Sequence, residues 1–72
     1  MVNKTIRQEF GERIKELRDK KGLTREELSA QAGILLSVII RSESGKGYGK
    51  LENIFAFMDF FGVTAEYLLR GR

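Results

Sequence analysis

The chain has 72 residues, with 13 lysines and arginines against 10 acidic residues, so its net charge of +3 is spread over a mixed surface. A chain this short forms one small domain that buries only about 60% of its unfolded surface, and dimerisation would add stability. Cysteine and histidine are both absent, which excludes a thiol nucleophile, an imidazole base, a disulfide and an ordinary zinc site.

No segment has the pattern of a membrane span or a secretion signal. The longest apolar run, from Ile34 to Ile40, is interrupted by Ser37 and is too short to cross a bilayer. Residues 1–10 lack the apolar core of a signal peptide. We therefore expect a cytoplasmic protein, and without a nucleophile, base and metal constellation we expect no enzymatic activity, cofactor or metal.

Residues 5–21 predict the first helix. The apolar residues there recur at steps of four, four and three, which places them in one stripe: Ile6, Phe10, Ile14 and Leu17. Lys20 and Lys21 suit the negative end of the helix dipole, and Gly22 ends the helix.

Residues 24–45 predict two short helices around a glycine turn. Thr24 can cap the first of them, and Glu27, three residues later, completes a capping box. Gly33 lies where the chain must turn, and the next helix ends at Gly45. This pattern favours a helix-turn-helix, although an ordinary helical hairpin would have the same features.

The run from Leu35 to Ile40 also has the composition of a buried strand, because Val38, Ile39 and Ile40 are β-branched. A strand is disfavoured because no second strand-like run exists to pair with it. The following loop, SGKGYGK over residues 44–50, carries Lys46 and Lys50 but lacks the spacing and the preceding strand of a nucleotide-binding loop.

Residues 51–61 predict a fourth helix with a wide apolar face. Its stripe is formed by Leu51, Ile54, Phe55, Met58 and Phe61, with Phe57 and Phe60 beside it. Gly62 ends this helix and Thr64 caps a fifth. We thus expect an all-α chain of five helices in a single domain spanning residues 1–72.

Three segments carry a family resemblance: GERIKELRDKKGLTREEL at residues 11–28, AGI at 32–34 and ESGK at 43–46. With their spacing they resemble the Cro/repressor-type (Xre-type) helix-turn-helix regulators, from about Ile6 to Leu69. The resemblance implies a compact five-helix bundle of the phage repressor-like DNA-binding type, whose third helix enters the major groove. It also implies a nucleoid-associated transcriptional repressor that binds double-stranded DNA as a homodimer on a two-fold operator.

The resemblance assigns roles to individual residues. It pairs Arg18 with Glu43, which would lock the first helix to the third, and it puts Arg25 beside a DNA phosphate. The residues that it places at the DNA are Arg25, Leu36, Ser37, Ile40, Arg41, Lys46, Tyr48 and Lys50. The family commonly has alanine near positions 58 and 60, so the bulky Met58 and Phe60 are expected to form a dimer surface.

The third helix departs from the family, which usually has polar residues at 35, 36 and 40, where this chain has Leu35, Leu36 and Ile40. Leu36 and Ile40 could touch thymine methyl groups beside Arg41. Alternatively, this face contacts a protein, or the helix is rotated so that Ile40 enters the core. A protein contact here or on the fourth helix would make the chain an antitoxin or another regulator that binds a partner such as a toxin. Two exposed aliphatic residues are also ordinary on any surface.

Overall fold

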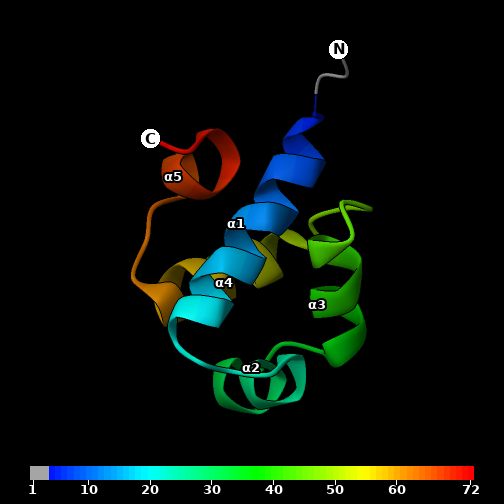
Figure 1. Cartoon of the computed structure of the whole chain (residues 1–72), viewed down its shortest axis with the longest axis vertical. Coiled ribbons are helices and arrows are strands. Elements are labelled where there is room, and N and C mark those ends of the chain that lie inside the picture. Colours follow the sequence, from blue (N-terminus) through cyan, green and yellow to red (C-terminus); the bar gives the residue numbers. More distant parts are fainter. Residues whose placement is uncertain (1–3) are drawn as a thin grey trace.

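The computed structural model describes residues 4–72, which form five α-helices and no strand (Figure 1). The helices are α1 Ile6–Lys20, α2 Arg25–Ala32, α3 Leu36–Glu43, α4 Leu51–Phe61 and α5 Ala65–Arg70. None of them, within these described residues, is long and apolar enough to cross a membrane. The all-α, five-helix prediction is confirmed, and the strand alternative for residues 35–40 is wrong because that run begins α3.

Local capping fixes where three of the helices begin. Thr5, Thr24 and Thr64 each accept a hydrogen bond from a backbone N–H in the first turn of α1, α2 and α5. At α2 the side chain of Glu27 accepts in return from the Thr24 N–H at 2.9 Å, which completes the predicted capping box. This backbone hydrogen bond lowers the pKa of Glu27 below its ordinary value.

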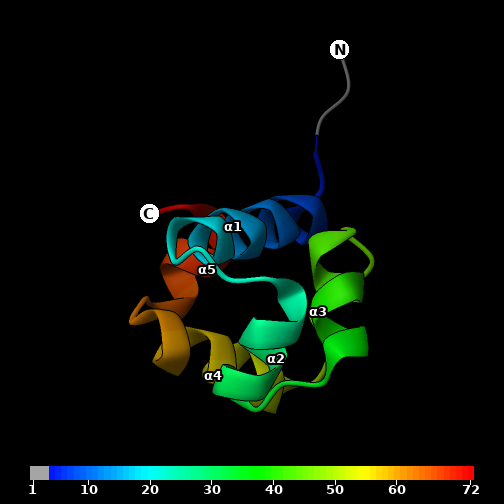
Figure 2. The ribbon, with the colours of Figure 1, turned by 60° about the horizontal axis from the view of Figure 1, so that its bottom comes forward.

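The core lies around α1, which runs between α3 and α5 (Figures 1 and 2). Its fully buried apolar side chains come from every helix and from the turn before α3: Phe10, Ile14, Leu28, Ile34, Ile39, Phe57 and Leu68. The predicted stripe on α1 is correct at Phe10 and Ile14, but Ile6 is 58% exposed. Periodicity identifies which face of a helix points inward, but it does not show how much of that face the other helices cover.

The backbones of α1 and α3 touch directly at Gly11. A Cβ atom at this position would overlap the carbonyl oxygen of Ser42, so only glycine fits. Ser42 itself is fully buried, and its hydroxyl is the only buried side-chain polar atom within residues 4–72 that has no hydrogen-bond partner. The distance between these two helices is therefore set by main-chain atoms.

The apolar face of α4 is rotated relative to the predicted stripe. Phe57, expected beside the stripe, is fully buried, whereas Leu51 and Phe55 are 65% and 51% exposed. Met58 and Phe60 are half-buried and pack against the core. Since large apolar residues cover all of α4 except the side with Glu52, Ala56 and Asp59, the sequence pattern could not define which of them point inward.

Candidate nucleic-acid interface

Helices α2 and α3 are joined by a short turn at one end of the molecule (Figure 2). Gly33 ends α2 in the left-handed conformation, with φ of 70°, which glycine adopts without steric cost. The Ser29 hydroxyl donates to the carbonyl of Ile34, and the Ile34 side chain is buried in the core. These contacts fix α3 relative to α2.

The exposed face of α3 carries Ser37, Ile40 and Arg41, with Leu36 partly exposed beside them. Ile39 is fully buried whereas Ile40 is 44% exposed, so the expected alternative in which Ile40 enters the core is wrong. Leu35 precedes the helix, is 72% exposed and provides no side-chain cap. One face of α3 is thus available to a partner, and it mixes aliphatic and polar groups.

Glu43 at the end of α3 joins three helices through two arginines. Arg18 of α1 donates from Nε to Glu43 Oε2 at 2.7 Å and from Nη2 to Oε1 at 3.0 Å. Arg25 of α2 donates from Nε to the same Oε1 at 2.9 Å. The Glu43 side chain is only 2% exposed, so its charge is neutralised inside the protein and not presented at the surface.

Arg18 also donates from Nη1 to the carbonyl of Leu23 at 2.8 Å, in the loop between α1 and α2. Hydrogen bonding to Glu43 raises the pKa of the Arg18 guanidinium, against the opposing effect of burial. The side chain of Arg25 remains 45% exposed. The link between Arg25 and Glu43 was not expected from the sequence, and no spacing rule would have revealed it.

The loop between α3 and α4 holds the remaining predicted residues. Lys46 and Lys50 are exposed at its two ends. Tyr48 is half-buried, and its ring meets Phe10 edge-on with centroids 5.0 Å apart. The Tyr48 ring therefore anchors the loop to the core.

Three basic residues of this region, like Arg7, Lys15 and Lys21 elsewhere in residues 4–72, take part in no ion pair. Arg13, Lys20 and Arg70 on α1 and α5 each pair with a glutamate one turn earlier. Across the described part of the chain, residues 4–72, no ion pair involves Arg41, Lys46 or Lys50. Their charges are therefore available to an anionic partner.

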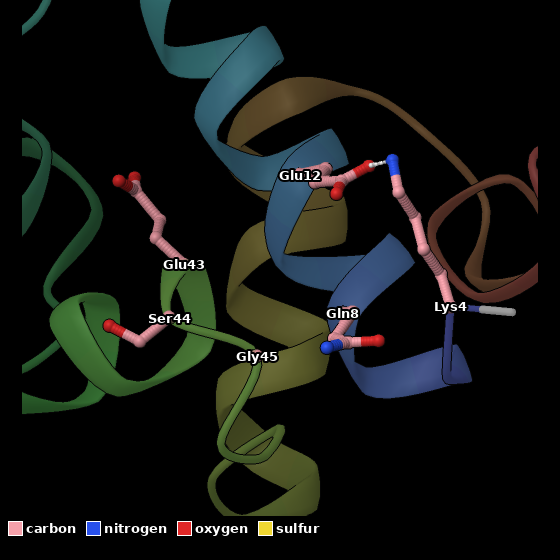
Figure 3. A pocket seen from close by; sticks show the side chains of 6 residues that line it. All are labelled: Lys4, Gln8, Glu12, Glu43, Ser44 and Gly45. Carbon is pink, nitrogen blue, oxygen red and sulfur yellow. Dashed lines mark hydrogen bonds and ion pairs between the residues drawn. The ribbon is translucent and has the colours of Figure 1, made fainter. Parts of the chain in front are cut away.

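A shallow hollow of about 220 Å³ lies between the start of α1 and the end of α3 (Figure 3). Lys4 pairs with Glu12 at 2.9 Å on the α1 side, and the carboxylate of Glu43 points away from Gln8 and Glu12. Lys4 and Glu12 thus satisfy each other, Glu43 is satisfied by Arg18 and Arg25, and the lining of the hollow offers no cluster of free charged groups to a ligand.

Comparison with known proteins agrees with this arrangement. The helix-turn-helix domain family matches residues 11–72. The HTH-type transcriptional activator BcrR of Enterococcus faecalis is 41% identical over 63 residues, which cover 88% of this chain and 31% of that relative. The chain thus spans about a third of the relative's length. On these matches and on the geometry of α2 and α3, the chain belongs to the helix-turn-helix family of transcription regulators.

Proposed function

We propose that the chain is a sequence-specific double-stranded DNA-binding regulator that places α3 in the major groove. The observation that carries this proposal is the exposed face of α3 with Ser37 and Arg41, which is followed by a loop whose Lys46 and Lys50 take part in no ion pair within residues 4–72. In helix-turn-helix proteins the second helix of the motif contacts base edges, and arginine is the commonest reader of guanine. Arg41 is the residue that we assign to a base.

The phosphate contacts follow from the surrounding cations. Lys46 and Lys50 are exposed on the loop after α3, and Lys50 precedes α4, whose first turn has no side-chain cap. Backbone N–H groups at such a helix start suit a phosphate. These contacts would position α3 without reading sequence.

Arg25 has a more particular role in this proposal. It uses only Nε on Glu43, and no hydrogen bond within residues 4–72 involves its two terminal nitrogens. A guanidinium can therefore bridge the buried carboxylate and a DNA phosphate at the same time. Glu43 would orient Arg25 before DNA arrives, which reduces the entropy lost on binding.

We also propose a homodimer on a two-fold operator, joined through α4. Met58 and Phe60 were the residues expected there, and the exposure of Leu51 and Phe55 adds a second part to this surface. Leu51, Phe55 and Met58 follow one another at helical spacing on one side of α4, whereas Phe60 lies on another side against Phe61. We therefore assign the contact between protomers to the row with Leu51, Phe55 and Met58.

The direction of regulation has two candidates. Repression is the simpler one, because a small domain that occupies a promoter blocks transcription without needing a second contact. Activation is favoured by the name of the relative, which is an activator. A promoter fusion carrying the bound site distinguishes them: repression lowers the reporter signal when the chain is expressed, and activation raises it.

Selection of binding sites from a randomised duplex pool tests the proposal directly. We expect a two-fold motif, and Arg41→Ala should change base preference at one position of each half-site. Folded protein that enriches no motif would contradict DNA recognition and would favour the alternative in which α3 binds another protein, such as a toxin.

A further inference from the structure

The apolar pair on α3, Leu36 and Ile40, is the surface feature that the phosphate and guanine contacts leave unexplained. The two residues lie one helical turn apart, with Cβ atoms roughly 5–6 Å from each other. Ile40 is 44% exposed, and Leu36 is partly exposed. We call this pair the α3 ridge. Ile39 fills the core position of this turn, so packing of the protein's own core does not account for the ridge.

The groups around the α3 ridge indicate what covers it. Ser37 and Arg41 flank it on the helix surface, and the carboxylate of Glu43, the only acidic residue of α3, is turned inward between Arg18 and Arg25. The ridge is thus an apolar strip on a face that bears positive charge. In the major groove the apolar group available to an aliphatic side chain is the 5-methyl of thymine, since other base-edge groups there are hydrogen-bond donors or acceptors.

We propose that the α3 ridge reads the 5-methyl groups of two pyrimidines in each half-site. Successive base pairs rise about 3.4 Å along the duplex, so a spacing of one helical turn between side chains reaches neighbouring or next-neighbouring pairs. The chemistry recognised is a methylated C5 position and not thymine as such. A 5-methylcytosine can therefore take the place of a thymine, and cytosine methylation strengthens binding at sites that carry cytosine there. This inference rests on the proposed DNA binding by α3.

The test changes only the DNA, so protein folding cannot obscure it. Each thymine of the selected half-site is replaced in turn by deoxyuridine, which removes the methyl and keeps every hydrogen bond. We expect about a fourfold loss of affinity at each of two positions, which corresponds to losing the burial of one methyl-sized group. Replacing the same T·A pair by 5-methylcytosine·G should bind about fourfold more tightly than replacing it by cytosine·G.

Protein variants then assign the methyl groups to residues. In Ile40→Ala the uracil effect should vanish at one position, and in Leu36→Ala at the other. Ile6→Ala is the matched control, because Ile6 is an exposed isoleucine on α1 that the proposal does not use. It should keep the full uracil effect at both positions.

Two results would overturn the inference while leaving DNA binding intact. One is a selected motif whose affinity is unaffected by uracil at any position, and the other is a uracil effect that Leu36→Ala and Ile40→Ala both retain in full. The absence of any selected motif would overturn the proposed function together with the inference.

Discussion

Two regions expose apolar side chains, and the helices that carry them differ in charge: α3 has an arginine on its exposed face, whereas the charged residues within α4 are acidic. On α3 the exposed Ile40 is followed by Arg41, and the loop after α3 carries Lys46. On α4, which exposes Leu51 and Phe55, Glu52 and Asp59 are the charged residues. The only adjoining cation along the chain is Lys50 before Leu51, since no basic residue occurs between Leu51 and Glu66.

This difference teaches that exposure alone does not identify a partner. An apolar strip among cations suits DNA, whose phosphates attract those cations. Carboxylates beside an apolar strip are repelled by DNA phosphates, so such a strip is better suited to contact a protein. This difference supports our proposal that α3 meets DNA and that α4 meets a second protomer.

The largest expected effect is the fall of DNA affinity with salt concentration. Its absence would contradict the assignment of DNA to α3. Six to eight phosphate contacts per dimer predict a slope of roughly −5 to −7 in a plot of log affinity against log salt. Between 50 and 200 mM salt the affinity should fall by about 10³ to 10⁴, which fluorescence anisotropy can measure. An affinity that stays constant over this range would show that the cations around α3 do not meet DNA.

The next effect tests α4. Phe55→Glu places a charge in the proposed contact between protomers, so sedimentation should show a monomer, and operator affinity should fall roughly a hundredfold or more as the two half-sites become unlinked. The melting temperature of the monomer unit should change little because Phe55 is half exposed. Parent protein that sediments as a monomer would contradict the α4 contact.

Phe60→Glu, on another side of α4, should differ from Phe55→Glu by affecting folding stability. The Phe60 ring meets Phe61 edge-on at 5.2 Å, and the Lys21 ammonium lies 5.4 Å from its centroid. This variant should lose folding stability, whatever it does to association. If Phe60→Glu dissociates a dimer without lowering stability, the interface lies on the other side of α4.

Glu43→Ala should destabilise the fold by about 3 kcal/mol, because it leaves Arg18 buried without its partner. Urea denaturation measures the change, and Asp59→Ala, which removes an exposed carboxylate on α4, should alter stability by less than about 0.5 kcal/mol. A loss as small as that of the control would show that water solvates Arg18 readily.

Arg41→Ala should weaken operator binding by about 1 to 3 kcal/mol and relax preference at one base pair. Lys46→Ala should instead weaken all sequences alike, with a smaller salt slope. Competition between the preferred site and single-base variants distinguishes the two. If Arg41→Ala also weakens all sequences equally, Arg41 contacts a phosphate.

The smallest expected effect is a change in folding stability from a substitution on the buried side of α3. Ser42→Ala removes a buried hydroxyl that has no partner, so it should stabilise the fold by about 1 kcal/mol and raise the melting temperature by about 4–8 °C. Ser44→Ala is the control, because that exposed hydroxyl donates to the Ile40 carbonyl at 2.7 Å. Unchanged stability in Ser42→Ala would indicate that a water reaches the hydroxyl.

Local chemistry made the helices predictable, whereas contacts between helices were only partly so. Thr24, Glu27 and Gly33 specify the limits of α2 through interactions that span a few residues, so the sequence contains them directly. The inner face of α4 was misplaced at Leu51 and Phe55 because apolar residues cover more than half of that helix. Its orientation depends on which side chains fit against α1, α2 and α5, which no periodicity encodes.

In the candidate site, too, the features set by local sequence were predicted and a contact between helices was not. The exposed residues of α3 follow from its position in the motif, but the bond between Arg25 and Glu43 joins residues 18 positions apart. That bond depends on how α2 and α3 cross. The family resemblance predicted the pair of Arg18 and Glu43, but it did not predict that Arg25 also binds Glu43.

The contact between Gly11 and Ser42 has a consequence for engineering. When two helices are separated by side chains, a rotamer change can let one slide, but here a carbonyl oxygen rests against a Cα atom. A library that randomises positions 36, 37, 40 and 41 would therefore change which bases α3 contacts while the axis of α3 stays in place. Position 11 should accept no replacement in such a library, even though alanine is normally the better helix former by about 1 kcal/mol. New DNA specificities could then be sought on a scaffold whose recognition element is held by its main chain.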